Sequence, residues 1–327
     1  MGSAVADDDV YVHRSALMGT VVSITVVGDR HSAGGLPRRT REGIARERQH
    51  AVERAIAWFE HVERICTRFD PRSELSQLTA RAGATLPVSA VLFQALRFAM
   101  ALAEETRGAF DPTVGTLMES RGFNVNYRTG KSLPEISGEP SRVWYRDVEL
   151  DEERQTVRVL RELTLDLGAV AKGLAVDLAA RELRDYPNVC VEAGGDGFVR
   201  GNNGRDGHWT VGIRHPRKSP ELLETLRLSE GAVCTSGDYE RPVTEGIAEH
   251  HIVDPRTGRS PKDVASVTVI APTAMLADGL GTAAFVLGAR DGLALLQAHG
   301  AEGLIVTPEM ERFATSGFAR YTAARRE

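Results

Sequence analysis

The segment LDLGAVAKGLAVD, residues 165–177, places a single lysine, Lys172, among glycines and alanines directly after a strand-like run. A lysine is costly to bury unless an anion accompanies it, and small neighbours let a large ligand approach the backbone. Helical spacing follows, so Lys172 is expected in the first turn of a helix, where free N–H groups and the dipole favour an anion. The GxxxxGK[ST] pattern of a P-loop is absent. A solvated lysine at a helix start is the alternative.

A second candidate site is ADGLGT at residues 277–282, where Asp278 and Thr282 are four residues apart and share one face of a helix. A carboxylate and a hydroxyl are hard oxygen ligands that suit Mg²⁺ or Ca²⁺ better than zinc. Backbone carbonyls, phosphates and water would complete the shell. Gly279 and Gly281 each weaken a helix by roughly 1 kcal/mol relative to alanine, and such glycines often mark close backbone approach.

A third candidate is HHIVDPRTG at residues 250–258, interpreted as a strand that enters an Asp-Pro turn. On a strand, His250 and His251 point to opposite faces, so they do not readily bind one metal ion. One of them is a candidate base or phosphate partner. Two surface histidines on a hairpin are the alternative.

Two glycine turns, VEAGGDG and VCTSGDYER, carry Asp196, Thr235, Ser236 and Tyr239, and each alone is an ordinary turn. The sequence has neither a GxSxG elbow nor an HExxH motif, so a serine hydrolase or a zincin has no support.

Composition excludes several further classes. The chain has 327 residues, 42% of them hydrophobic, with a net charge of −5, which does not suggest nucleic-acid binding. Three separated cysteines, Cys66, Cys190 and Cys234, argue against a disulfide framework and a structural zinc site. The N-terminal residues are acidic and no run of about 18 apolar residues occurs. We therefore expect a cytoplasmic protein without a membrane span.

The elements that must position these residues are helices and strands in alternation. Helical spacing predicts helices at about 44–66, 88–106 and 169–185, and two more over 275–288 and 290–300. Strand-like runs include 21–27, 163–168, 188–195 and 248–255, and many are joined by short turns. This predicts an α/β (mixed α+β) fold with a largely antiparallel sheet and packed helices. We expect an N-terminal tail over 1–15 and one domain over 16–327.

Taken together and in order, these segments resemble the ApbE family of FAD:protein FMN transferases. The blocks that carry the resemblance are MGT (18–20), FDPRSEL (69–75), GAFDPTVG (108–115), LDLGAVAKGLAVD, VEAGGD, VCTSGDYER, HHIVDPRTG and ADGLGTAAFVLG. The resemblance implies a single-domain ApbE-like fold with an FAD cleft. It also implies Mg²⁺-dependent transfer of FMN from FAD to a threonine or serine of a partner flavoprotein, with release of AMP.

The resemblance further implies roles for single residues. Those expected to contact FAD are Met18, Phe69, Ala109, Phe110, Asp111, Asp166 and Lys172, with Lys172 near the pyrophosphate. Asp278, Thr282 and the carbonyl of Ala169 are expected to hold Mg²⁺, and His251 is the candidate base. Where relatives often read ADALST, this chain reads ADGLGT, which brings the rigidity of that helix into question.

Two other functions are compatible with the same residues. A hydrolase variant would split FAD into FMN and AMP with water in place of the acceptor hydroxyl. A non-enzymatic protein would only bind FAD, although mere binding needs no metal beside the pyrophosphate.

Overall fold

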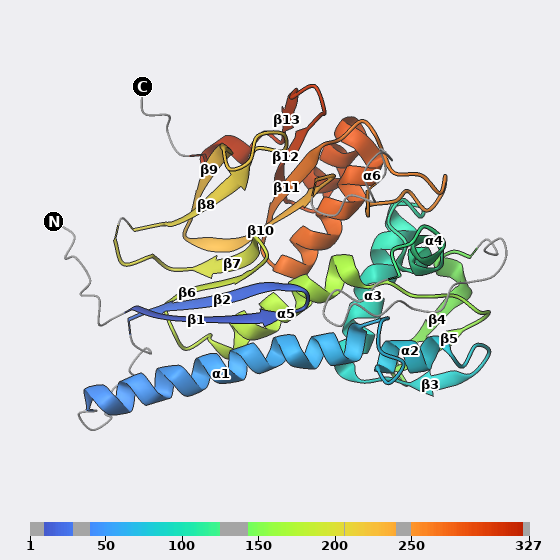
Figure 1. Cartoon of the computed structure of the whole chain (residues 1–327), viewed down its shortest axis with the longest axis horizontal. Helices are drawn as coiled ribbons and strands as arrows, with labels where there is room; N and C mark the ends of the chain where they lie inside the picture. Colours follow the sequence, from blue (N-terminus) through green and yellow to red (C-terminus); the bar gives the residue numbers. More distant parts are fainter. Residues whose placement is uncertain (1–9, 29–39, 125–142, 206, 240–249, 323–327) are drawn as a thin grey trace.

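The computed structural model describes residues 10–28, 40–124, 143–205, 207–239 and 250–322 (Figure 1). Its main feature is an eight-stranded sheet in which every neighbouring pair is antiparallel. In sheet order the strands are β1 (Val10–Leu17), β2 (Thr20–Val27), β6 (Asn188–Ala193), β7 (Asp196–Arg200), β10 (Glu230–Gly237), β11 (Ser266–Ala271), β12 (Glu302–Val306) and β13 (Arg312–Ala314). The predicted mixed α+β class with a largely antiparallel sheet is confirmed.

The hairpin β1–β2 begins the sheet and is joined by Met18 and Gly19. Both residues have positive φ, 52° and 72°, as a two-residue hairpin turn of type I′ requires. Strand β2 buries alternate residues, Val22, Ile24 and Val26, because one face of the strand is packed against the helices. Strand β1 starts at Val10, so residues 10–15, assigned from the sequence to a tail, belong to the sheet.

Three long helices, α1 (Arg41–Cys66), α5 (Gly168–Glu182) and α6 (Ala274–Ala298), pack against one face of this sheet. A fourth, α3 (Ala90–Glu105), packs against these helices. Figure 1 shows α1 along one side of the molecule, with α5 between it and the middle of the sheet. Helix α5 is rich in alanine and buries Leu174 and Val176 completely. Its small side chains let α1 and α6 approach from both sides.

Two smaller sheets complete the fold. The hairpin of β8 (Trp209–Arg214) and β9 (Leu222–Leu228) covers the opposite face of the main sheet and encloses a second core that includes Ile213, Leu226 and Phe318. The other small sheet contains β3 (Thr85–Pro87), β5 (Thr156–Val159) and β4 (Val148–Asp151), in that order. The short helices α2 (Glu74–Thr79) and α4 (Gly115–Ser120) lie at the same end of the molecule (Figure 1).

Helix α6 is two helices joined at Gly288, whose φ of 81° and ψ of 179° are not helical. This confirms the two helices expected over 275–288 and 290–300. Within the described residues, α6 alone is long and apolar enough to span a membrane, but 56% of its most apolar window is buried inside the protein. Such burial is typical of a core helix.

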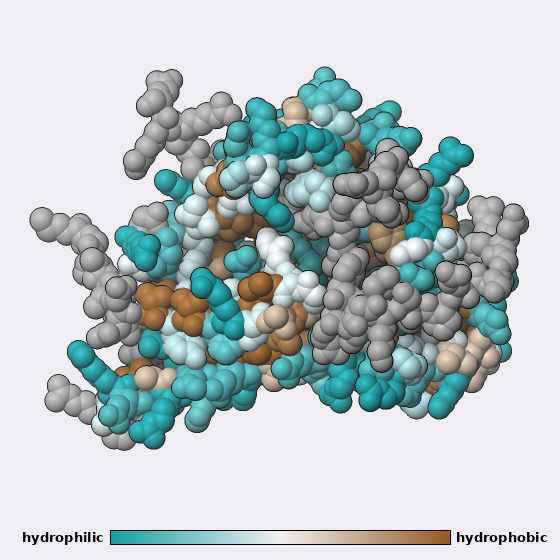
Figure 2. All heavy atoms as spheres, viewed as in Figure 1, coloured by the Kyte–Doolittle hydropathy of each residue, from teal (hydrophilic) through white to brown (hydrophobic). Residues whose placement is uncertain are grey.

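Figure 2 shows one face of the molecule, with polar side chains over most of it. Apolar side chains gather where β1 and β2 lie, and Val12 and Val21 are 46% and 58% exposed there.

Two predicted strands are wrong. Residues 163–168 form no strand because their N–H groups bond elsewhere: Thr164 N donates to Thr116 Oγ1 and Asp166 N donates to the Pro112 carbonyl, both at 2.8 Å. Residues 250–255 form an irregular segment and a turn, in which Gly258 N donates to the Asp254 carbonyl at 2.8 Å. The sequence also predicts a surface loop over 28–43 and a polar, turn-rich surface segment over 121–145, and most of both lies outside the described residues.

Candidate active site

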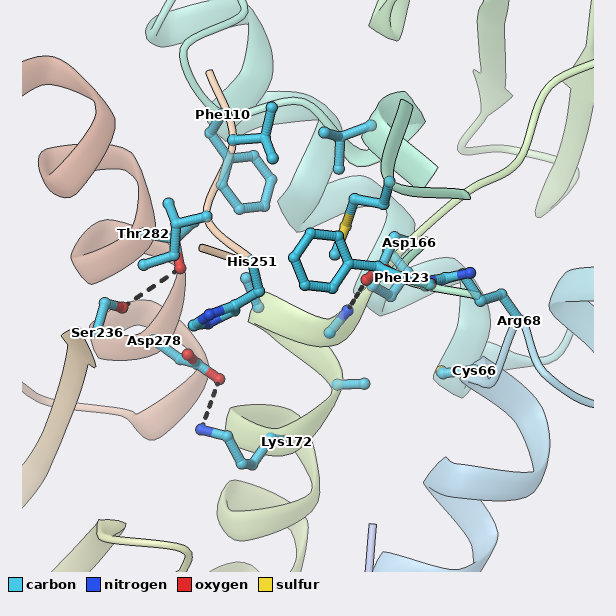
Figure 3. Close-up of a pocket in the computed structure, with 18 of the residues that line it drawn as sticks. Cys66, Arg68, Phe110, Phe123, Asp166, Lys172, Ser236, His251, Asp278 and Thr282 are labelled. Carbon is cyan, nitrogen blue, oxygen red and sulfur yellow. Dashed lines mark hydrogen bonds and ion pairs between the residues drawn. The ribbon is translucent and has the colours of Figure 1, made fainter. Parts of the chain in front are cut away.

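A cleft of about 290 Å³ opens between the hairpin β1–β2, the start of α5, the end of β10 and α6. Each residue proposed from the sequence as a ligand or base contributes to its wall (Figure 3). These residues are Met18, Phe69, Ala109, Phe110, Asp111, Asp166, Ala169, Lys172, His251, Asp278 and Thr282. Segments separated by more than 250 residues of sequence therefore meet at one site.

Lys172 forms ion pairs with two carboxylates of the cleft. Its ammonium group contacts Asp196 Oδ2 closely and lies 3.3 Å from Asp278 Oδ2. Asp196 is fixed in turn by Thr235, whose backbone N–H donates to Oδ1 at 2.7 Å. Lys172 is the fifth residue of α5. It therefore begins the second turn of the helix, and the prediction that it lies in the first turn is wrong. The anions that accompany Lys172 in this structure are protein carboxylates.

Asp278 and Thr282 lie on successive turns of α6 and both face the cleft (Figure 3). Thr282 Oγ1 lies 3.5 Å from Ser236 Oγ at the end of β10. Asp278 and Thr282 thus place a carboxylate and a hydroxyl beside Ser236, a second hydroxyl, and these are donors that hard cations prefer. No group of three or more His, Cys, Asp or Glu side chains suited to a metal ion occurs within the described residues.

The glycines of ADGLGT do not loosen α6. A Cβ on Gly279 would lie 2.7 Å from the Phe98 ring of α3, and a Cβ on Gly281 would lie 3.2 Å from Ser236 Oγ. Both glycines are buried within regular helix. Because these glycines have no side chain, α3 and β10 can approach α6 closely. This close packing keeps the helix regular despite its two glycines.

The two adjacent histidines separate between the core and the cleft. His250 is buried, donates from Nε2 to the Pro261 carbonyl at 3.0 Å, and packs edge-on against Phe285. His251 lines the cleft, on the side where Asp278 and Thr282 lie (Figure 3). Only one of the two histidines faces the site, as expected, although the segment is not a strand.

The other end of the cleft lies around the buried Arg68 side chain (Figure 3). Phe69 and Phe123 line it there, and the Arg68 guanidinium lies over the Phe69 ring, 4.2 Å from its centroid. An aromatic wall of this kind suits a flat ring system.

Arg68 links three elements around that end. Its Nε donates to Asp166 Oδ2 at 2.7 Å, Nη1 donates to Glu119 Oε1 at 3.3 Å, and Nη2 donates to the Phe123 carbonyl. Only 5% of the side chain is exposed, so these acceptors replace water. Asp166 also accepts from Gly168 N at 2.7 Å, which fixes the start of α5.

The Asp111 carboxylate accepts hydrogen bonds from its own loop and from a segment later in the chain. Oδ1 accepts from the backbone N–H and the hydroxyl of Thr113, both at 2.8 Å, and Oδ2 accepts from Tyr145 N at 2.9 Å. Burial raises the pKa of the Asp111 carboxyl above its usual value, and these hydrogen bonds oppose that rise. The contacts favour a structural role, whereas a role in gripping a nucleotide stays a prediction.

Sequence reasoning missed Arg68, and it named Ser236 and Asp196 without giving them a role in the site. Ser236 and Asp196 stand in glycine turns whose local pattern is ordinary. The only sequence feature that could have indicated Arg68 is its place directly before Phe69. Nothing in the local sequence predicts that its charge is buried.

The sequence profile of the ApbE family matches residues 18–305. This range includes every residue of the cleft named above. The chain belongs to the ApbE family. The resemblance recognised in its sequence blocks is confirmed, as is the assignment to the transferases.

Named relatives and solved structures agree with this assignment. The FAD:protein FMN transferase of Treponema pallidum is 30% identical, over 94% of this chain and 87% of its own length. The crystal structure of the ApbE protein of Thermotoga maritima has a TM-score of 0.80 and 31% identity, covering 96% of this chain and all of that one. The flavin transferase ApbE of Vibrio cholerae has a TM-score of 0.77 and 26% identity, covering 95% and 99%.

Proposed function

We propose that this chain is a Mg²⁺-dependent FAD:protein FMN transferase that moves FMN from FAD to a threonine or serine hydroxyl of an acceptor flavoprotein and releases AMP. The observation that carries the proposal is the two-ended cleft. The end around Arg68 has the aromatic side chains of Phe69 and Phe123, and the other has charged and hydroxyl groups around Asp278. The aromatic end suits the flavin ring of FAD, and the polar end suits its phosphate chain. The names of the relatives supply the reaction.

The residues of the polar end fit a divalent cation. Asp278 and Thr282 offer oxygen ligands from one face of α6, and Ala169 lines the same cleft from the start of α5. These three residues would hold Mg²⁺, with phosphate oxygens and water completing the shell. Mg²⁺ bound there would polarise the phosphates and stabilise the charge that develops on departing AMP.

The chain's own residues would orient FAD for an in-line displacement. The acceptor hydroxyl oxygen forms a bond to the phosphorus on the riboflavin side, and the bond from that phosphorus to the AMP phosphate oxygen breaks. AMP leaves with the electron pair. An imidazole nitrogen of His251 is the candidate acceptor of the hydroxyl proton. Lys172 would orient Asp278 and place positive charge beside the phosphates.

The test is an incubation of the purified protein with FAD, Mg²⁺ and an acceptor domain that bears a flavinylation threonine. Acceptor mass and AMP are measured together, with and without EDTA, for the wild type and for Asp278→Asn. A mass gain equal to FMN with one AMP per acceptor, abolished by EDTA and reduced at least 100-fold in the variant, is the expected result.

Other outcomes would replace the proposal. Free FMN and AMP with an unmodified acceptor would identify an FAD pyrophosphatase. Bound FAD with neither product, in assays with several acceptor sequences, would identify a flavin-binding protein. A location in the cytoplasm and the absence of a nucleic-acid partner stay predictions from the sequence.

A further inference from the structure

The last residue of LDLGAVAKGLAVD, Asp177, has no part in the reaction as proposed above, yet its carboxylate reaches the helix that carries Asp278. Asp177 lies on α5. Its Oδ1 accepts from Ala274 N at 2.7 Å and its Oδ2 accepts from Met275 N at 2.9 Å. Ala274 and Met275 are the first two residues of α6, whose N–H groups have no partner within the helix. Asp177 therefore caps α6 from a neighbouring helix.

Two further contacts hold the same turn. A Cβ on Gly173, one turn before Asp177, would lie 2.5 Å from the Ala274 carbonyl oxygen and 2.6 Å from Met275 Cα, so the backbones of α5 and α6 meet there. From β10, the Cys234 thiol lies 3.5 Å from the Ala274 carbonyl oxygen. The start of α6 is thus held by α5 and by the sheet.

These contacts at the start of α6 determine the position of Asp278, the proposed metal ligand. Asp278 lies four residues after Ala274, one turn along α6, and Lys172 directly precedes Gly173 in α5. The distance between α5 and the first turn of α6 therefore fixes how Asp278 faces Lys172 and Ala169. We propose that Asp177 is a positioning residue for the metal site, which holds α6 in register with α5 so that Asp278 and Thr282 meet the cation. The inference rests on the proposed Mg²⁺-dependent function.

The chemistry of the carboxylate makes the inference testable by a small change. Two oxygens of one carboxylate accept two adjacent N–H groups, and the negative charge complements the positive end of the α6 dipole. Asp177→Asn keeps the shape but leaves one oxygen, and its NH₂ group faces the second N–H. Glu182→Gln is the matched control, because Glu182 lies on the same helix and pairs with Arg54 at the surface.

Direct binding of Mn²⁺, followed by electron paramagnetic resonance in the presence of FAD, is the first measurement. For Asp177→Asn we expect at least tenfold weaker Mn²⁺ binding, while FAD affinity in EDTA stays within twofold of the wild type. At saturating Mg²⁺ the transfer rate of the variant should return to near the wild-type kcat. Glu182→Gln should match the wild type throughout.

The outcomes separate the two claims. Mn²⁺ binding by Asp177→Asn equal to that of the wild type would overturn the positioning role, and so would a variant that loses FAD in EDTA as strongly as it loses metal. No Mn²⁺ binding by the wild type would reject the metal-dependent function and this inference with it. If the variant does not fold, amide hydrogen exchange of the wild type decides: fast exchange at Ala274 and Met275 would show that the cap does not hold.

Discussion

Lys172 Nζ lies 3.3 Å from Asp278 Oδ2 and also pairs with Asp196, so one ammonium group forms ion pairs with carboxylates from a helix and a strand. The two carboxylates are 9% and 8% exposed, and the lysine is 24% exposed. Burying this cluster is tolerated because opposite charges lie in contact. The cluster keeps one net negative charge, which a divalent cation at Asp278 would offset.

Replacement of Lys172 should therefore make stability depend on metal. Lys172→Met leaves two buried carboxylates without their cation, and we expect it to lower the free energy of unfolding by about 3–5 kcal/mol in EDTA. Mg²⁺ should restore more stability to the variant than to the wild type. Thermal unfolding in EDTA and in Mg²⁺ measures both effects, with Lys218→Met, at an exposed position, as the control. Equal Mg²⁺ shifts in variant and wild type would contradict the prediction.

Replacement of Arg68 should weaken FAD binding, because several N–H donors of its guanidinium hold the aromatic end of the cleft together. Arg68→Lys keeps the charge but cannot reach Asp166, Glu119 and the Phe123 carbonyl together, so we expect a loss of about 2–3 kcal/mol in stability. FAD affinity in EDTA, measured by flavin fluorescence, should fall at least fivefold because Phe69 loses its stacked partner. Arg72→Lys, whose side chain is 88% exposed, is the control. Unchanged FAD affinity in Arg68→Lys would remove Arg68 from the site.

The close packing of α6 predicts the effect of Gly279→Ala. Alanine favours a helix by about 1 kcal/mol over glycine, but the new methyl group would meet the Phe98 ring, and such overpacking costs about 1–3 kcal/mol. We expect a net loss of stability in urea denaturation. Gly43→Ala in α1 is the comparison, since only the Thr40 hydroxyl comes within 4 Å of its Cβ. A stabilised Gly279→Ala protein would mean that α3 and α6 are packed more loosely than described.

The cysteines should be unreactive in the folded protein. Burial raises the pKa of the Cys66 and Cys190 thiols to about 12 and that of Cys234 well above its usual value. At pH 8 almost no thiolate is present. A thiol reagent such as DTNB should modify none of the three in native protein and all three in denaturant. Rapid labelling of one thiol in native protein would show that its surroundings open.

The pH dependence of stability should report Asp177. Burial raises the pKa of its carboxyl to about 6, against hydrogen bonds from Met275 and Ala274. The folded protein then binds this proton more tightly than the unfolded chain, so the stabilisation is full below about pH 4 and is lost as the pH rises through 6. The stability of the wild type relative to Asp177→Asn should accordingly fall from pH 4 to pH 7.5 in urea titrations. A constant difference would show that the carboxyl titrates normally.

The sequence predicts the composition of this site better than its internal contacts. Short ordered blocks place Lys172, His251, Asp278 and Thr282 in one cleft, because each block carries a distinctive chemistry or turn. The partners of Lys172 lie 24 and 106 residues away in sequence, and no local pattern indicates them. Asp111 has the residue type of a ligand, yet its oxygens are engaged by Thr113 and Tyr145, which only the tertiary structure shows.

The fold was predictable where periodicity is strong. Helices α1, α3 and α5 and the break at Gly288 follow from apolar spacing and from glycine. The run 163–168 alternates leucine with polar residues as a strand does, but Pro112 and Thr116 take its backbone N–H groups. Strand periodicity indicates burial on one side and does not identify the hydrogen-bond partner.

The pairing of β2 with β6 determines when the hairpin β1–β2 of a growing chain can join the rest of the main sheet. Val27 pairs with Asn188, 161 residues later in the chain. At a synthesis rate of roughly 5–20 residues per second, the hairpin waits about 8–32 s after it is made for its neighbouring strand. Through that interval Val22, Ile24 and Val26 have no β6 beside them, and the hairpin has an open edge of the kind that chaperones bind. The cleft, whose wall includes Met18 and Thr282, can be assembled only when every residue up to Thr282 has left the ribosome.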